Sequence, residues 1–484
     1  MVVKSRIAVL INHLQQGLLE RDTPARLALL AALSGEHLLL LGPPGTAKSE
    51  LARRLHTLVD DGRYFERLLT RFSVPEELFG PLSIKALEQD RYQRQTRGYL
   101  PEAAIAFIDE IFKANSAILN SLLTLLNERQ FDNGSERLGV PLISVIAASN
   151  ELPEGAELNA LYDRFLLRFQ VAPVQDDSFT ALLTLNHGYQ APAPELRLSN
   201  DDLTAIRDGA EQLPLTDALI RLLHSLRAFL AEQDISVSDR RWRKVVKLLK
   251  VSAFCNHEAE AGLFDTWLLP HCLWQQPEQF ERLNDWLYRH IAADPGFSPE
   301  LITELVDSWQ QRLEQDADPV LPALNEQGYQ LYLDEQGQPV TEARGRRPRR
   351  NANGDLLYRQ PRLPDASFTA DEIRNLGGNL DQYEPLLESY QRPTALQPKA
   401  WPAAHIASRL RQLEERIEEL THYLAWLGQQ LNGLNERLRQ HLWLEQDLAT
   451  QAQRQLERQQ QQLSQQRERL QQLHRDFAAL PVEG

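Results

Sequence analysis

The sequence predicts an α/β core with a parallel sheet, followed by an all-helical lid, a small β-rich module and long C-terminal helices. Three observations support this order. Residues 37–170 alternate short apolar strands with helices, a pattern typical of a largely parallel sheet. Residues 200–310 carry amphipathic helical patterns and lack strand signals. From about Pro402, apolar residues recur at alternating spacings of four and three, which indicates a coiled coil or helical hairpin.

These patterns divide the chain into four predicted regions. An α/β core should occupy residues 1–190, and a helical lid with the start of a helical domain residues 191–315. The β-rich module should span 316–400 and the long helices 401–484. Heptad helices cannot leave all their apolar side chains in water, and the pattern from Ile302 to Leu313 offers a matching face. We therefore expect a discontinuous helical domain into which the β-rich module is inserted.

The heptad pattern has two stretches separated by a register break near Leu442 and Trp443. The first comprises Ile406, Leu410, Leu413, Ile417, Leu420, Leu424, Leu427, Leu431 and Leu434. The second comprises Leu456, Leu463, Leu470, Leu473 and Phe477. Because the heptad persists, we interpret the glutamine-rich surface of this region as a solvated helix face.

The β-rich module is predicted from its turn residues. Leu331 and Leu333 alternate with polar residues before a turn at 335–338, and a second turn at 351–355 precedes another short strand. A basic run at 344–350 lies between the two turns, in a chain that is otherwise acidic.

Composition excludes several classes of protein. A chain of 484 residues is too long for a single hydrophobic core. The net charge of −15 has the wrong sign for a protein whose main partner is duplex DNA, so we do not expect a nucleic-acid partner. No apolar segment approaches the ~20 residues that span a bilayer. Two cysteines suit a reducing compartment, and we expect a cytoplasmic protein.

A glycine-bearing loop after the apolar run at 37–41 gives the strongest functional signal. A strand that enters such a loop and a helix that leaves it form a phosphate-binding loop. Its backbone N–H groups would hold phosphates, Lys48 would reach the β/γ oxygens and Ser49 would hold Mg²⁺. The residues expected to bind nucleotide are Gly42, Pro43, Pro44, Gly45, Thr46, Ala47, Lys48 and Ser49. The alternative is an ordinary proline-glycine turn before a helix.

Ala47 stands where a glycine usually precedes the lysine. Only a positive φ makes glycine close to mandatory, so we expect Ala47 to have a helical φ.

A second apolar strand, Ile105 to Asp109, ends in two carboxylates. The sheet would place Asp109 at the edge that bears the phosphate loop. Asp109 would bind the Mg²⁺ shell, and Glu110 would orient and polarise the attacking water. An apolar run that ends in Asp-Glu is common and by itself is a weak indication of nucleotide binding. Together with the phosphate-binding loop it is a strong one.

A third buried strand, 142–149, ends at Asn150, whose amide could contact the γ-phosphate or the attacking water. The alternative is a turn or helix cap, which asparagine also favours.

Two arginine-bearing segments are candidates for transition-state stabilisation. Arg164 or Arg168 could act on the nucleotide of another subunit, or could form a surface salt bridge. The second segment is the first turn of a helix that begins with Arg240 and that Ser238 or Asp239 can cap. Arg240 or Arg241 in this turn could couple the lid to ATP. A basic solvated helix face is the alternative for this second pair.

Together these residues resemble the AAA+ ATPases, and most closely the MoxR subfamily and its RavA group. The resemblance is specific across roughly residues 10–250 and weak in detail beyond them. The matching stretches are Gly42 to Ser49, Thr70 to Ser83, Gly98 to Glu102, Phe107 to Glu110, Ile118 to Arg129, Ala148 to Pro153 and Leu161 to Phe165.

The resemblance implies a role for each matched residue. Lys48 and Ser49 match the Walker A lysine and hydroxyl, and Asp109 and Glu110 the Walker B pair. Asn150 matches sensor 1. Arg164 resembles the arginine finger with Arg168 as the second choice, and Arg240 resembles sensor 2 with Arg241 as the second choice.

The resemblance also implies partners. It predicts a homo-hexameric ring that binds ATP or ADP with Mg²⁺ and remodels or matures partner proteins. A von Willebrand factor A domain protein would assist it, and residues 316–400 would contact a target such as inducible lysine decarboxylase. Hairpins are expected at 82–92 and 130–135, the second from its Asn-Gly pair.

Two other functions remain open at this point. One is a DNA-acting ATPase of the helicase-loader or minichromosome-maintenance type, against which the acidic balance argues. The other is a scaffold that binds nucleotide without turnover, although Glu110 and Asn150 are both present.

Overall fold

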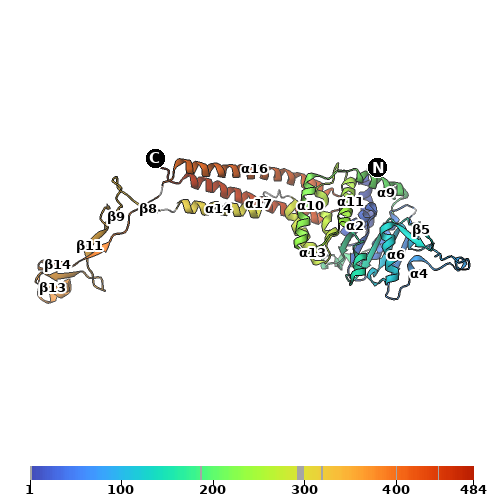
Figure 1. Cartoon of the computed structure of the whole chain (residues 1–484), viewed down its shortest axis with the longest axis horizontal. Coiled ribbons are helices and arrows are strands. Elements are labelled where there is room, and N and C mark those ends of the chain that lie inside the picture. Colours follow the sequence, from blue (N-terminus) through green and yellow to red (C-terminus); the bar gives the residue numbers. More distant parts are fainter. Residues whose placement is uncertain are drawn as a thin grey trace. The chain divides into compact units, whose positions relative to one another are not determined.

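The computed structural model describes residues 3–60, 62–185, 188–291, 299–317, 320–398, 400–444 and 446–483 (Figure 1). It describes their side chains except those of residues 364, 398, 430–436, 439, 446–449, 451, 452 and 455. The chain forms two compact units. The first contains Met1–Ser298 and Ala425–Gln461, and the second contains Pro299–Leu424 and Gln462–Gly484.

A five-stranded parallel sheet forms the core of the first unit, with the strand order β2-β3-β6-β1-β7. Its strands are β1 (Leu38–Leu41), β2 (Tyr64–Leu68), β3 (Ile105–Asp109), β6 (Ser144–Ser149) and β7 (Leu167–Gln170). The neighbouring strands β6 and β1 are buried along their whole length, as expected when both faces of a parallel sheet are covered. The predicted parallel α/β core is confirmed.

Helices α1 to α8 accompany this sheet. They are α1 (Val3–Gln15), α2 (Asp22–Ser34), α3 (Lys48–Thr57), α4 (Glu76–Phe79), α5 (Ile84–Leu87), α6 (Ser116–Glu128), α7 (Ala156–Tyr162) and α8 (Asp176–Leu183). Helix α2 is buried along nearly its whole length and packs against α1, α3 and β1. It therefore lies at the centre of the core, and its first residue directly follows Arg21.

Both segments expected to form hairpins contain antiparallel pairing. β4 (Gln130–Asn133) pairs with β5 (Glu136–Gly139), and Gly134 begins the two-residue turn with a φ of 69°. That positive φ is what a tight hairpin turn requires. The other segment has a single bridge between Leu82 and Arg94, and its tip is the short helix α5.

The lid of the first unit is helical, as predicted. Its helices are α9 (Asn200–Glu211), α10 (Asp217–Glu232), α11 (Asp239–Cys255), α12 (Leu269–Leu273) and α13 (Glu278–Ile291), and the 3₁₀ helix η4 spans Leu263–Leu268. The Ser238 hydroxyl caps α11 by accepting a hydrogen bond of 3.2 Å from the Arg241 N–H. Helix α11 packs on α9 and on α2, which ties the lid to the α/β core.

Two long helices, α16 (Ala403–Arg439) and α17 (Gln446–Ala478), are joined by a turn that belongs to the first unit. Leu442, Trp443 and Leu444 of this turn are buried. The Leu442 N–H donates to Asn256 Oδ1 at 3.0 Å, and its carbonyl accepts from the Arg26 guanidinium. The predicted register break is thus the anchored tip of a helical pair.

In the second unit, α14 (Pro299–Ala317) packs with parts of α16 and α17. The Trp309 ring meets the Phe477 ring edge-on at 5.9 Å, and Asp307 forms an ion pair of 2.8 Å with Arg469. Among the predicted heptad residues, Ile406, Leu413, Leu420, Leu424, Leu427, Leu456, Leu463, Leu470, Leu473 and Phe477 are buried. The side chains of Leu431 and Leu434 lie outside the described residues.

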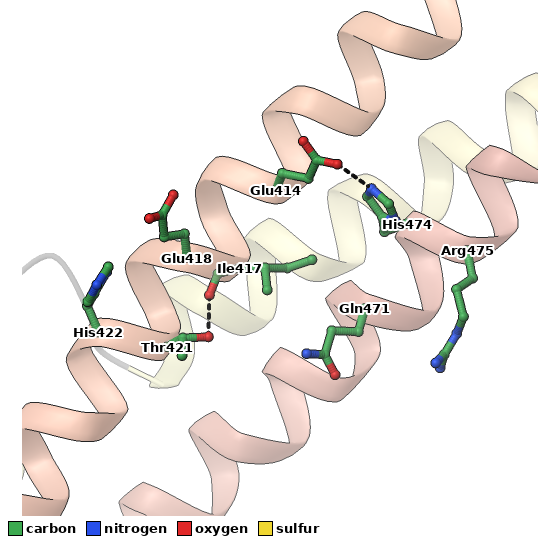
Figure 2. A pocket seen from close by; sticks show the side chains of 8 residues that line it. All are labelled: Glu414, Ile417, Glu418, Thr421, His422, Gln471, His474 and Arg475. Atoms are coloured by element: carbon green, nitrogen blue, oxygen red, sulfur yellow. Dashed lines mark hydrogen bonds and ion pairs between the residues drawn. The ribbon is translucent and has the colours of Figure 1, made fainter.

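An open groove of about 670 Å³ runs between α16 and α17 in the second unit (Figure 2). His474 Nε2 lies 3.1 Å from Glu414 Oε1 across it, and Ile417 and Gln471 line it further along. In the described part of the chain, no helix combines the length and apolar character needed to cross a bilayer.

The β-rich module consists of small antiparallel sheets. Its strands are β8 (Val320–Pro322), β9 (Tyr332–Leu333), β10 (Pro339–Val340), β11 (Arg344–Pro348), β12 (Leu357–Gln360), β13 (Leu363–Thr369), β14 (Glu384–Pro385), β15 (Leu387–Gln391) and β16 (Leu396–Pro398), and α15 spans Ala370–Asn375. β8 pairs with β16, so the two ends of the module lie side by side. The Asp334 and Asn351 side chains stabilise the two predicted turns by accepting backbone N–H bonds.

Candidate nucleotide-binding site

The phosphate-binding loop begins at the carboxyl end of β1, which lies between β6 and β7 in the sheet. The Gly42 N–H donates to the Ser149 carbonyl at 3.0 Å, which fixes the start of the loop against β6. A Cβ atom on Gly42 would lie 2.1 Å from the Val171 carbonyl oxygen, so the close approach of these two segments requires glycine. The first N–H groups of α3 have no partner within the helix and are available to an anion.

Ala47 has φ 63° and ψ 22°, so the expectation of a helical φ was wrong. This residue occupies the left-handed region, where a Cβ approaches the carbonyl oxygen and costs about 1–2 kcal/mol. Ala47 therefore adopts the backbone conformation of the usual glycine, with strain, at the position where α3 begins. Strained residues of this kind cluster at binding sites because the surrounding structure holds them there.

Arg21 is one such surrounding group, and no sequence motif pointed to it. Its side chain is buried, and its Nε donates to the Thr46 carbonyl at 3.0 Å. Its other nitrogens donate to the carbonyls of Ala172, at 2.8 Å, and Glu20, at 2.7 Å. Burial lowers the pKa of Arg21, and Glu20 opposes this effect. The guanidinium thus ties the loop to two neighbouring segments of backbone.

Lys48 lies beneath the loop with only 7% of its surface exposed. Its Nζ donates to the carbonyls of Gly42, at 2.8 Å, and Pro43, at 2.7 Å. Burial lowers the pKa of Lys48, while Asp109 and Glu110 raise it. The structure therefore brings the predicted lysine and the two predicted carboxylates into one electrostatic group.

Asp109 and Glu110 lie at the carboxyl end of β3. Asp109 Oδ1 accepts a hydrogen bond of 3.0 Å from the Glu110 N–H, which orients the carboxylate. Glu110 has a left-handed backbone, with φ 53° and ψ 45°. Burial raises the pKa of Glu110, with further increases from Asp109 and Glu151, against the lowering effects of Lys113 and Lys48. A raised pKa suits a carboxylate that accepts a proton.

Asn150 directly follows β6, the strand that lies between β1 and β3 in the sheet. Its position is therefore between the phosphate loop and Asp109. Ser149, rather than Asn150, stabilises the turn: its hydroxyl donates to the Glu151 carbonyl at 2.7 Å and accepts from the Glu151 N–H. Because Asn150 is exposed and Gly155 is the residue that precedes α7, the alternative of a helix cap loses support.

Arg164 and Arg168 have different surroundings. Arg168 is 2% exposed, its guanidinium lies 3.7 Å from the Tyr162 ring centroid, and burial lowers its pKa to about 9. It packs inside the fold and cannot reach another subunit. Arg164 keeps 20% of its side chain exposed and has an ion pair of 3.5 Å with Asp163. Burial lowers the pKa of Arg164, and the positive charge of Arg240 lowers it further.

Arg240 and Arg241 also differ. Arg241 is buried and donates to four backbone carbonyls, those of Asp163, Phe165, Leu166 and Cys272, at 2.7–3.1 Å. It therefore fastens the lid to the segment before β7. Arg240 is exposed and donates to Asn127 Oδ1. Arg164 and Arg240 thus lie near enough for the charge of Arg240 to act on Arg164, and neither is among the charged groups that shift the pKa of Lys48.

The predicted ligands of Mg²⁺ are compatible with the ion. Ser49 lies in the first turn of α3, which packs on β3, and the influence of Asp109 on Lys48 places that carboxylate near the same turn. Mg²⁺ is held by one or two protein oxygens and takes its remaining ligands from phosphates and water. Within the described ranges, no group of three or more His, Cys, Asp or Glu side chains could hold a metal alone.

Comparisons with known proteins identify the family of the core and the lid. Residues 5–207 match the family described as the MoxR domain in the MoxR-vWA-beta-propeller ternary systems, and residues 218–287 match the AAA lid domain. Two uncharacterized proteins of Methanocaldococcus jannaschii are similar. One is 39% identical over 308 residues, covering 63% of this chain and 80% of that protein. The other is 43% identical over 265 residues, covering 54% of this chain and 68% of that protein.

A crystal structure from Cytophaga hutchinsonii, described as a candidate ATPase, is 18% identical, with a TM-score of 0.48 and coverage of 60% of this chain and 94% of that one. The segments that match the two family models, 5–207 and 218–287, contain the loop, the two carboxylates and the four predicted arginines. The chain belongs to the MoxR family of AAA+ ATPases.

Proposed function

We propose that this protein hydrolyses ATP in a hexameric ring whose active sites are shared between neighbouring subunits. One observation carries the proposal: Arg164 and Arg240 lie near each other, and neither is among the charged groups that shift the pKa of Lys48. Two like charges held near each other favour an anion between them. In a closed ring, the phosphates bound by one subunit would supply that anion to the next. Arg240 would then act on a neighbour's nucleotide, together with Arg164, rather than on its own.

The residues of one subunit would divide the chemistry among them. The loop N–H groups hold the phosphates, and Lys48 leaves the carbonyls of Gly42 and Pro43 to bind phosphate oxygens. Mg²⁺, when bound through Ser49 and Asp109, neutralises developing phosphate charge. Glu110 orients the attacking water and accepts its proton, and Asn150 aligns that water with the phosphate.

We also propose which proteins the ring assembles with and what it does to its target. Partner proteins of the kinds in the family description, a von Willebrand factor A domain protein and a β-propeller protein, would assemble with it, and the ring would remodel or mature a target. The RavA-like arrangement would make residues 316–400 the contact site, with inducible lysine decarboxylase as one target to test. We also propose a cytoplasmic location, since both cysteines are buried free thiols.

ATP hydrolysis and nucleotide binding by Lys48→Gln test the enzymatic claim. Loss of the ammonium should abolish turnover, with Lys85→Gln as the matched control because Lys85 is exposed on α5. Wild-type turnover in Lys48→Gln would exclude the proposed site.

Removal of residues 320–395 tests the recruitment claim. Since β8 and β16 bring the module's ends together, the deletion should leave ATP hydrolysis intact and abolish binding of the von Willebrand factor A or propeller partner. Retained partner binding would refute the module's role.

A further inference from the structure

Strand β11 has one edge that no strand in the described residues covers. Its other edge pairs with β15 in the register Arg344↔Gln391 to Pro348↔Leu387. Two hydrogen bonds flank this ladder, from the Arg349 N–H to the Leu386 carbonyl and from the Arg392 N–H to the Ala343 carbonyl. They show which residues of β11 turn their backbone groups toward β15.

In an antiparallel pair, residues that bond to the partner alternate with residues whose N–H and C=O point away. The odd-numbered residues of β11 therefore bond to β15. The N–H and C=O groups of Arg344 and Arg346 point to the uncovered edge, and Pro348 presents a carbonyl alone.

The same strand carries a dense positive charge. Five of the seven residues from 344 to 350 are arginines. Arg347 is neutralised by an ion pair of 2.7 Å with Glu388 and lies over the Tyr390 ring. Among the described residues, Arg344 and Arg346 have no acidic partner, and both are exposed. Because side chains alternate between the faces of a strand, these two lie on one face, on the side away from Arg347.

We propose that the uncovered edge of β11 binds an extended acidic segment of a partner protein by strand addition. The backbone of the segment would pair with the outward N–H and C=O groups of Arg344 and Arg346. Acidic side chains at alternate positions of the segment would face the two guanidinium groups, at the ~5.5 Å Cα separation of a bonded antiparallel pair. This inference rests on the proposed recruiting role of the module and specifies the chemistry of what it recruits.

The edge discriminates against other occupants. A second copy of β11 would place arginines opposite arginines, which repel. Nucleic-acid phosphates would satisfy the guanidinium groups, but they carry no donor for the outward carbonyls of Arg344, Arg346 and Pro348. An acidic peptide satisfies both the charges and the backbone groups, since each of its residues brings an N–H and a C=O.

The test uses the full chain and a fluorescein-labelled peptide of alternating glutamate and threonine, followed by fluorescence anisotropy. A peptide of the same composition with its glutamates in one block, and an oligothymidylate of similar length, serve as comparison probes. We expect the alternating peptide to bind more tightly than the block peptide. Equal binding of the two peptides, or tighter binding of the oligothymidylate, would overturn the proposal.

Paired variants separate charge from backbone pairing. Arg344→Glu with Arg346→Glu should weaken the alternating peptide by about tenfold or more. Arg359→Glu with Arg374→Glu makes the same change in charge elsewhere in the module and should have a smaller effect.

Arg346→Pro and Arg346→Ala lose the same side chain, but only proline also loses the outward N–H. Arg346→Pro should therefore bind roughly twofold to tenfold more weakly than Arg346→Ala, the effect of one hydrogen bond. Equal affinities of these two variants would refute strand addition.

ATP hydrolysis should be unchanged in every edge variant. Failure of the peptide test would therefore leave the proposed ATPase untouched, and failure of the Lys48→Gln test would leave the peptide result standing.

Discussion

Arg21 and Thr46 are joined by a hydrogen bond of 3.0 Å, from the guanidinium Nε to the backbone carbonyl oxygen. In a trans peptide the carbonyl and the next N–H point in opposite directions. The bond therefore also sets the direction of the Ala47 N–H, on the opposite side of the same peptide plane. By holding this peptide, Arg21 helps to maintain the left-handed conformation of Ala47 and directs one N–H of the loop toward the proposed phosphate position.

Arg21→Gln should weaken nucleotide binding. Without Arg21 the Ala47 N–H would no longer be directed at the phosphate, and the loss of one hydrogen bond to a charged group costs about 1.5–3 kcal/mol, so we expect the Kd for ADP to rise roughly tenfold or more. Isothermal titration calorimetry can measure this, with Arg97→Gln as an exposed control. An unchanged Kd in a folded Arg21→Gln protein would show that the contact does not position the loop.

Ala47→Gly should stabilise the protein, although glycine normally destabilises. Relief of left-handed strain contributes about 1–2 kcal/mol, and the greater freedom of glycine in the unfolded chain offsets part of it. The matched control is Ala205→Gly, an exposed position inside α9, which should cost about 1 kcal/mol. Chemical denaturation measures both. Destabilisation of similar size in the two variants would argue against strain at Ala47.

Arg240→Ala and Arg241→Ala should separate activity from stability. Arg241 is buried and bonded to four carbonyls, so its removal should cost about 3–5 kcal/mol of folding free energy. Arg240 is exposed, so its removal should change stability by less than about 0.5 kcal/mol. Turnover by the Arg240 variant should nevertheless fall. Full turnover in Arg240→Ala would remove this residue from the proposed site.

The pH dependence of hydrolysis should reflect the raised pKa of Glu110. The carboxylate form is required to accept a proton, so activity should fall as the pH drops through that pKa, at a higher pH than for an ordinary glutamate. Burial is the main cause of the shift, and Lys113 opposes it. Lys113→Gln should therefore move the acid limb of the pH–rate profile to higher pH, and Lys85→Gln should not. A shift to lower pH in Lys113→Gln would contradict the assignment.

The sequence was sufficient for the sheet and for the residues at its carboxyl edge. Asp109 and Asn150 are found there because strands that alternate with helices favour a parallel sheet, and parallel strands end at one edge. Lys48 was found because its loop has a recognisable spacing. Both signals are local in the sequence: short apolar runs mark the strands, and the polar residues directly after them mark the site.

The contributions of Arg21 and Arg241 could not be predicted from sequence. Each acts through backbone carbonyls of segments distant in the chain, and backbone carbonyls leave no mark in a sequence. The choice between Arg240 and Arg241 likewise depends on which side of α11 meets the core. Ala47 was misjudged because the sequence shows the absence of glycine but not the φ that the loop imposes.

The most direct test of a site shared between subunits is the ATP hydrolysis of rings mixed from two inactive variants. Glu110→Gln lacks the residue that activates water, and Arg164→Ala lacks the arginine proposed to act on the neighbour. In a mixed ring, an interface is complete where an Arg164→Ala subunit binds ATP beside a Glu110→Gln subunit. Random equal mixing should restore roughly a quarter of wild-type activity, because one pairing in four is complete. Mixtures as inactive as the separate variants would contradict the account.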